Sequence, residues 1–293
     1  MRNAWSPKAF TRKRLLPLPK LIAALLSMRS SSVQVGLDSF FGSLGSDGDL
    51  QHVVSDRAFA KARDNLSWSG FQRLNTFVVN LASKMGLVPR WQGLRVVAGD
   101  ASAFMPALRA YTPAIDSKKT AAAPSQHLFT LYLPGAELTL LSELHGLQVG
   151  ERQMLFEALS HLLPGDVLVL DRGYFKRLKH VQKIESASGL SQQAVNIDVQ
   201  AKTLADNLNT LVCMGALAQD DLRNTGKQCN RSYAGNCLQR SMPRLVLGLG
   251  CVAALLEKAF DLLCITAYKP RLGRKAKRPK NQVKPHPKPG YKA

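Results

Sequence analysis

Apolar residues recur along this chain with two different spacings. Up to about residue 90 the spacing is helical, as the leucines and phenylalanines of 57–66 and 71–79 show. From Leu94 onward the apolar runs are short, rich in valine and leucine, and bounded by glycine or proline, which is typical of buried strands. The pattern predicts strands at 94–99, 128–133, 137–144 and 167–170.

Helical spacing returns at 152–163, after residue 175, and in an apolar block at 244–268. Strands followed by helices in this order predict a mixed α/β layer fold. We expect a helical N-terminal domain at 1–90, an α/β core at 91–268 and a tail at 269–293. The apolar run 245–256 is too short to span a bilayer, so it predicts a buried helix and no membrane segment.

The spacing of the small residues in 248–253 matches the G-x-G-x-x-A pattern of dinucleotide-binding sites. The acidic residue expected about 20 positions later at a second strand is lacking. Close helix packing is the better explanation for them. No shared metal-ligand spacing links His127, His145, His161 and His180, so structural or solvent-facing roles are expected for them. The five cysteines show no CxxC motif and predict reduced core residues of a cytosolic protein.

Positive charge is the dominant feature of the composition. Forty Lys and Arg against 20 Asp and Glu give a formal net charge of +20. Nine of the basic residues lie between Arg271 and Lys292, with four prolines and no acid among them, which predicts a disordered arm that finds a polyanion by charge. Nucleic acid is the favoured partner. An acidic membrane surface is the alternative, but the tail has a single aromatic residue, Tyr291, and no acyl anchor.

Two aspartates, Asp100 and Asp171, directly follow the predicted strands 94–99 and 167–170. An ionised carboxylate at the end of a buried strand is costly unless a cation or a donor meets it. If the two strands are neighbours, the carboxylates can share a divalent ion, and oxygen ligands suit Mg²⁺ or Mn²⁺. The alternative is that either aspartate caps a turn.

Several segments together carry a resemblance to bacterial transposases. They match, in sequence and order, the insertion sequence 4 family of DDE transposases, and the most specific of them is the tetrapeptide after the last apolar strand. The segments are 57–66, Asp100-Ala-Ser, Gly150-Glu-Arg152, Asp171-Arg-Gly-Tyr174 and 189–208. The resemblance implies a ribonuclease H-like core with a mixed sheet flanked by helices, in which two Asp and one Glu hold two Mg²⁺ or Mn²⁺ ions for cleavage and transfer of DNA strands.

The resemblance also implies partners and further site residues. The partners would be double-stranded DNA, both element ends and target, and a second copy of the chain or an intact relative, in the bacterial cytoplasm at the nucleoid. Side chains after the second aspartate would contact DNA phosphates, with Lys179 in the place of the family's phosphate-contacting lysine. These residues are Arg172, Tyr174, Lys176, Arg177 and Lys179. Lys176 and Arg177 fit a solvated basic surface equally well.

The third acid of the family is not found in this chain. With Lys179 as the lysine of the family's pattern, the position of the catalytic Glu falls on Arg172, and arginine cannot bind a metal. We infer that a segment holding this Glu is absent. Glu185, Asp198 and Asp206 are poor replacements and are expected to be helix-surface acids or caps. Two functions therefore remain: a DDE transposase with impaired catalysis, or a catalytically dead remnant that only binds DNA.

Overall fold

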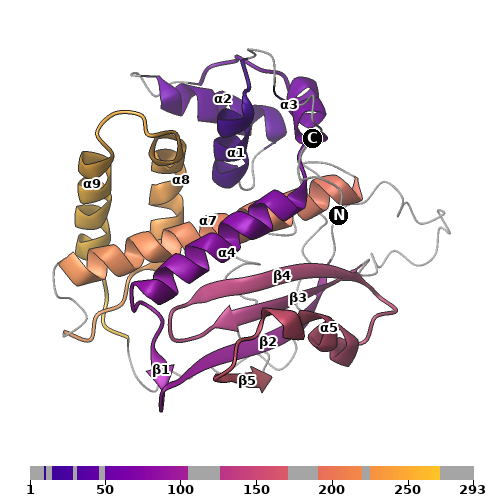
Figure 1. The fold of residues 1–293 in the computed structure, drawn as a ribbon. Helices are drawn as coiled ribbons and strands as arrows, with labels where there is room; N and C mark the ends of the chain where they lie inside the picture. The colour runs from indigo at the N-terminus through magenta and orange to yellow at the C-terminus, as the bar shows by residue number, and fades with distance from the viewer. Residues whose placement is uncertain are drawn as a thin grey trace, which may run out of the picture.

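The computed structural model describes residues 10, 15–28, 32–45, 50–104, 126–170, 191–219 and 225–270. These residues form an α/β structure in which a mostly antiparallel sheet is flanked by helices (Figure 1). Strands β2 (Leu94–Phe104), β3 (Gln126–Leu133) and β4 (Leu138–Gly146) make an antiparallel meander. The short β1 (Arg90–Trp91) pairs antiparallel with the start of β2, and β5 (Asp166–Leu170) pairs with β2 in parallel. All four predicted strands are therefore present.

Strand β2 is longer than the sequence pattern predicts. The prediction ended this strand at Gly99, but pairing with β3 runs from Ala98, opposite Tyr132, to Phe104, opposite Gln126. The polar residues after Gly99 stay in the ladder because β3 supplies backbone partners for them. Asp100 consequently lies inside the strand and not at its end, so the turn-capping alternative is wrong for this residue.

Helix α5 (Glu151–Ala158) and the 3₁₀ turn η2 (Leu159–His161) connect β4 to the parallel strand β5. The predicted helix 152–163 thus ends its α-helical part five residues early. The chain turns into β5 at Pro164 and Gly165, and the carboxylate of Asp166 accepts from the backbone N–H of Leu163. Met154 and Ala158 lie on the inner side of α5, where they are buried in one cluster with apolar residues of the sheet.

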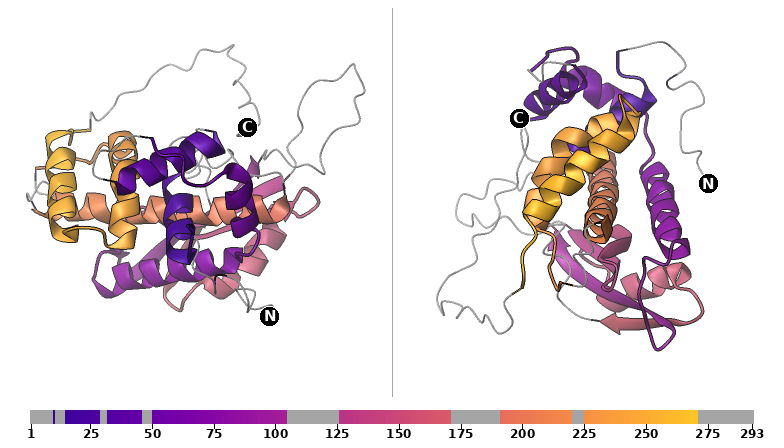
Figure 2. Two further views of the ribbon diagram at one scale, coloured as in Figure 1. Left: turned by 90° about the horizontal axis from the view of Figure 1, so that it is seen from above. Right: turned by 90° about the vertical axis from the view of Figure 1, so that its left-hand side faces the viewer.

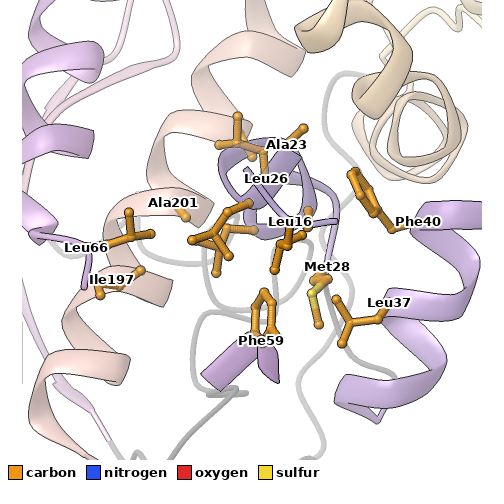
Figure 3. Close-up of a cluster of buried hydrophobic side chains, with 14 of the residues drawn as sticks. Leu16, Ala23, Leu26, Met28, Leu37, Phe40, Phe59, Leu66, Ile197 and Ala201 are labelled. Atoms are coloured by element: carbon orange, nitrogen blue, oxygen red, sulfur yellow. The ribbon is translucent and has the colours of Figure 1, made fainter. Parts of the chain in front are cut away.

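The part of the chain described before the sheet is helical, as predicted, and contains α1 (Leu18–Ser27), α2 (Val33–Leu44), α3 (Asp56–Arg63) and α4 (Trp68–Lys84). The hydroxyls of Ser32 and Ser55 accept from backbone N–H groups in the first turns of α2 and α3 and so fix where these helices begin. Figure 3 shows the apolar cluster that joins α1, α2 and α3 to residues of α7, with Phe59 and Leu37 among its buried side chains.

Helix α7 (Gln192–Gln219) runs through the centre of the molecule, with α4 beside it (Figures 1 and 2). One side of α7 packs on the N-terminal helices through Ile197, Ala201 and Leu204. Another side meets strand β4, and its C-terminal half contacts α9 (Val252–Ile265). Because the N-terminal helices share a core with α7, the boundary near residue 90 stays a prediction, as does the one at 268.

The apolar run 245–256 is not one buried helix, so that prediction is wrong, whereas the block 244–268 is largely helical as predicted. Helix α8 (Arg231–Leu247) ends at Gly248, which is left-handed at φ 62°, and Gly250 has φ 77° before α9 begins. Only glycine adopts these angles without strain, so the small residues of 248–253 make a tight turn and do not serve helix packing as predicted. The turn leaves Leu249 and Val252 exposed.

The structure bears on the predictions about a membrane segment and about the cysteines. In the described part of the chain, no helix combines the length and the apolar character that crossing a bilayer requires. All five cysteines are free thiols. Cys213 and Cys229 are buried as predicted, whereas Cys251 is exposed at the start of α9, because the turn at Gly248 and Gly250 carries it to the surface.

Candidate metal centre

Asp100 lies in the middle of β2, directly opposite Thr130 of β3. Only 8% of Asp100 is exposed. Thr130 in turn pairs with Ser142 of β4, so the three side chains share one face of the sheet. Helix α7 reaches this face at Ser142, whose hydroxyl accepts from Thr203 at 3.2 Å. The candidate ligand is therefore held on a central strand, with polar neighbours on its own face.

The second predicted strand lies beside the first. β5 pairs with β2 from Arg95, opposite Asp166, to Gly99, opposite Leu170. Leu170 is the last described residue of β5, and Asp171 lies outside the described residues. The two strands are neighbours, which is the condition for their aspartates to share an ion. In sequence, Asp100 follows Gly99, and Asp171 follows Leu170, the residue paired with Gly99.

An ion pair fixes the register of these two strands at their starts. Arg95 donates two hydrogen bonds to the carboxylate of Asp166, Nε to Oδ1 at 2.7 Å and Nη2 to Oδ2 at 2.5 Å. Both side chains are nearly fully buried. Burial raises the pKa of Asp166, but the hydrogen bonds from Arg95 and Leu163 and the positive charges of Arg95 and Arg90 outweigh it, so the pKa lies below its usual value of 3.8. The sequence pattern does not reveal this pair, because only the parallel pairing brings residues 95 and 166 together.

The oxygen donors around Asp100 suit a hard divalent cation. The hydroxyl of Thr130 is buried and has no hydrogen-bond partner among the described residues. Directly opposite residues on antiparallel strands have Cβ atoms about 5 Å apart, so a carboxylate and a hydroxyl oxygen both fall within reach of one ion. Mg²⁺ and Mn²⁺ prefer such oxygen ligands, so the residues present fit the predicted ion.

The other predicted site residues are not placed. Arg172, Tyr174, Lys176, Arg177 and Lys179 all lie outside the described residues, as do Glu185 and the helix predicted after residue 175. The tail is described only as far as Pro270. Their roles as phosphate contacts therefore stay predictions.

The two acids on α7 are not surface acids, so that prediction is wrong. Asp198 is 5% exposed and Asp206 is 3% exposed, with the buried Lys202 between them. Residues at this spacing of four share one face of a helix, so the lysine lies one turn from each carboxylate. The sequence pattern hid their burial because α7 is enclosed on several sides and lacks a clear polar face. Within the ranges that the structure describes, no group of three or more His, Cys, Asp or Glu is placed to hold a metal ion.

A polar cluster that the spacing did not indicate lies at the end of the meander. His127 and His145 are directly opposite each other on β3 and β4. The Nδ1 atom of His145 lies 3.5 Å from a carboxylate oxygen of Glu157 on α5. The two histidines are 18 positions apart in sequence, so only the strand register could have revealed this pairing.

Comparison of the chain with protein-family models, with curated proteins and with solved structures found no match.

Proposed function

We propose that this chain is a DNA transposase of the DDE type whose catalytic set is incomplete, so that strand cleavage and transfer are impaired. Its core would be ribonuclease H-like, and it would act on double-stranded DNA at the bacterial nucleoid, paired with a second copy or an intact relative. The support comes from the topology. An antiparallel meander, a helical crossover and a fifth strand parallel to the first of the meander are the arrangement that the proposal requires.

The parallel pairing of β2 and β5 is the single observation that carries this proposal. Consecutive Cα atoms are 3.8 Å apart and paired strands about 4.8 Å apart, so the Cα atoms of Asp100 and Asp171 cannot be more than about 12 Å apart. We propose that the register continues by one residue. The two aspartates would then face each other about 5 Å apart, on the face that carries Thr130.

Asp100, Asp171 and the hydroxyl of Thr130 would hold the ion, which supplies an activated water or hydroxyl and neutralises charge on a phosphate oxygen. The chain itself contributes position: Asp100 is fixed by pairing on a central strand, and the Arg95–Asp166 ion pair sets the register that brings β5 beside it. A buried carboxylate on such a strand keeps its direction while DNA binds.

A nicking assay tests the transposase proposal. Supercoiled plasmid carrying candidate element ends is incubated with the full chain and Mg²⁺ or Mn²⁺, and open circles are scored. Weak nicking that needs the metal and disappears in Asp100→Ala supports the proposal. Nicking that Asp100→Ala leaves unchanged contradicts it. Asp64→Ala, an exposed acid just after α3, is the matched control.

A dead remnant that only binds DNA is the second candidate, and one observation favours it. The acids of α7 are buried in the helix beside Lys202, and among the described residues no group of three His, Cys, Asp or Glu is placed to hold a metal ion. Under this candidate the plasmid stays supercoiled in every variant while DNA still binds. Binding is measured by fluorescence anisotropy against salt, and log affinity should fall with log salt by about 0.9 per phosphate contacted.

A further inference from the structure

A polar groove lies between the N-terminal and the C-terminal helices, well away from the strands that carry the candidate metal centre. It has a volume of about 870 Å³ and is lined by residues of α2, α8 and α9. Figure 1 shows these helices meeting at the end of the molecule opposite the sheet. The lining combines apolar side chains such as Phe40 and Leu255 with the hydroxyls of Ser39 and Ser43.

The charge of the groove has one sign. Arg240 and Arg244 line it from α8 and Lys258 lines it from α9, and none of the described residues in its wall is acidic. Arg240 and Lys258 are exposed, so their charges face solvent at the groove. Three cations without an opposing carboxylate repel one another, and an anion bound between them would relieve that repulsion.

Arg244 adds a second, independent observation. Its Nε atom is buried and has no hydrogen-bond partner among the described residues. A buried donor on a charged group destabilises the protein when it is left without a partner. The side chain lies in the last turn of α8 and lines the groove.

We propose that this groove binds the phosphodiester backbone of a DNA strand, with Arg240, Arg244 and Lys258 as the phosphate contacts. The proposal rests on the proposed function only for the identity of the polyanion; the groove itself follows from the described residues. Arginine and lysine are the usual partners of backbone phosphates, and serine hydroxyls donate to the same oxygens.

Two thiols in the same molecule make this groove directly testable. Cys237 is partly buried and lines the groove, whereas Cys251 is exposed and lies outside it. The full chain is labelled with N-ethylmaleimide, with and without a short DNA duplex, and each cysteine is quantified by mass spectrometry. Burial raises the pKa of Cys237, although the charge of Arg240 opposes this, so labelling is run at mildly alkaline pH.

DNA at ten times its Kd should slow the labelling of Cys237 about tenfold and leave Cys251 unchanged. Anisotropy on the same samples shows whether DNA is bound. If DNA is bound and Cys237 still reacts at the rate of the DNA-free protein, the assignment of the groove as a DNA-binding site is overturned while the proposed function stands. If no DNA binds at any salt concentration, the proposed function fails as well. Protection by inorganic phosphate or by RNA, but not by DNA, also overturns the assignment.

Charge-matched variants give a second readout. Arg240→Gln with Lys258→Gln removes two phosphate contacts and should lower the salt slope of DNA binding by about 1.8. Arg73→Gln with Lys84→Gln removes two exposed charges from α4 and should leave the slope nearly unchanged. Equal slopes for the two double variants would overturn the proposal. All four side chains are exposed, so both variants are expected to fold.

Discussion

The two edges of the sheet are secured in different ways. At β4, side chains of α4 and α7 satisfy the backbone of the edge strand: Asn207 bonds both the N–H and the C=O of Thr139 at 2.8 Å, and Asn75 donates to the same C=O at 3.0 Å. At β5, the last two residues, Val169 and Leu170, are 44% and 61% exposed. Besides its backbone ladder with β2, β5 is held by the ion pair at its start. The candidate metal centre therefore lies at the less supported edge.

The largest effect on stability is expected from breaking the Arg95–Asp166 ion pair. Arg95→Met leaves the carboxylate of Asp166 buried beside β2 without its cation, which should lower the free energy of unfolding by about 3–5 kcal/mol. Urea denaturation measures the loss. Arg73→Met on the exposed face of α4 is the control and should change little. A loss below about 1 kcal/mol for Arg95→Met would show that the β5 edge does not depend on this pair.

Removing the side-chain amide of Asn207 at the β4 edge should lower the free energy of unfolding by about 3 kcal/mol. Asn207→Ala deletes the two bonds to Thr139 and the 2.7 Å bond to Asn75, and it leaves their buried polar groups without partners. Asn80→Ala, an exposed position on α4, is the matched control. The comparison of edges fails if Asn207→Ala unfolds no more easily than Asn80→Ala.

The pH dependence of stability separates the two edges more finely. The pKa of Asp166 is lowered in the folded state, so its contribution is complete above the unfolded value near 3.8 and is lost as the pH falls through the lower folded value. The difference in urea midpoint between the native chain and Arg95→Met should therefore shrink below about pH 4. Asn207→Ala removes no charge, so its difference in urea midpoint from the native chain should stay the same down to about pH 4.

The smallest effect is expected at Gly99, beside Asp100. A Cβ there would lie 3.3 Å from Cδ2 of Leu170 and 3.5 Å from Cδ2 of Leu131. Because Leu170 is mostly exposed, it can give way, and Gly99→Ala should change stability by less than about 1 kcal/mol. Gly215→Ala is the contrast, since its Cβ would meet Phe260 at 2.8 Å inside the molecule. A larger loss at Gly99 than at Gly215 would mean that the β5 edge is rigid.

The strands were predictable from the sequence because each is a short apolar run ended by glycine, proline or a turn. What the pattern could not show was pairing beyond the apolar part. β2 continues past Gly99 through polar residues because β3 lies alongside, and this continuation puts Asp100 inside the strand. The continuation, Asp-Ala-Ser-Ala-Phe at 100–104, is too short and too weakly apolar to be recognised as part of a strand.

Burial of polar residues was the other limit. Asp198 and Asp206 look like surface acids in sequence, but α7 is surrounded by the N-terminal helices, β4 and α9. Likewise the ion pair of Arg95 and Asp166 joins residues 71 positions apart and becomes visible only in the parallel register. Charge and motif could suggest a metal site and a DNA partner, while the contacts that hold the site in place depend on tertiary structure.

The central claim is that Asp100 and Asp171 bind one divalent ion together. Titration with Mn²⁺, followed by the electron paramagnetic resonance of the free ion, measures this in the native chain, in Asp100→Asn, in Asp171→Asn and in the double variant. If the ion is shared, either single substitution should weaken the site nearly as much as both together. Mn²⁺ binding that survives in either single variant at the native affinity would contradict the claim.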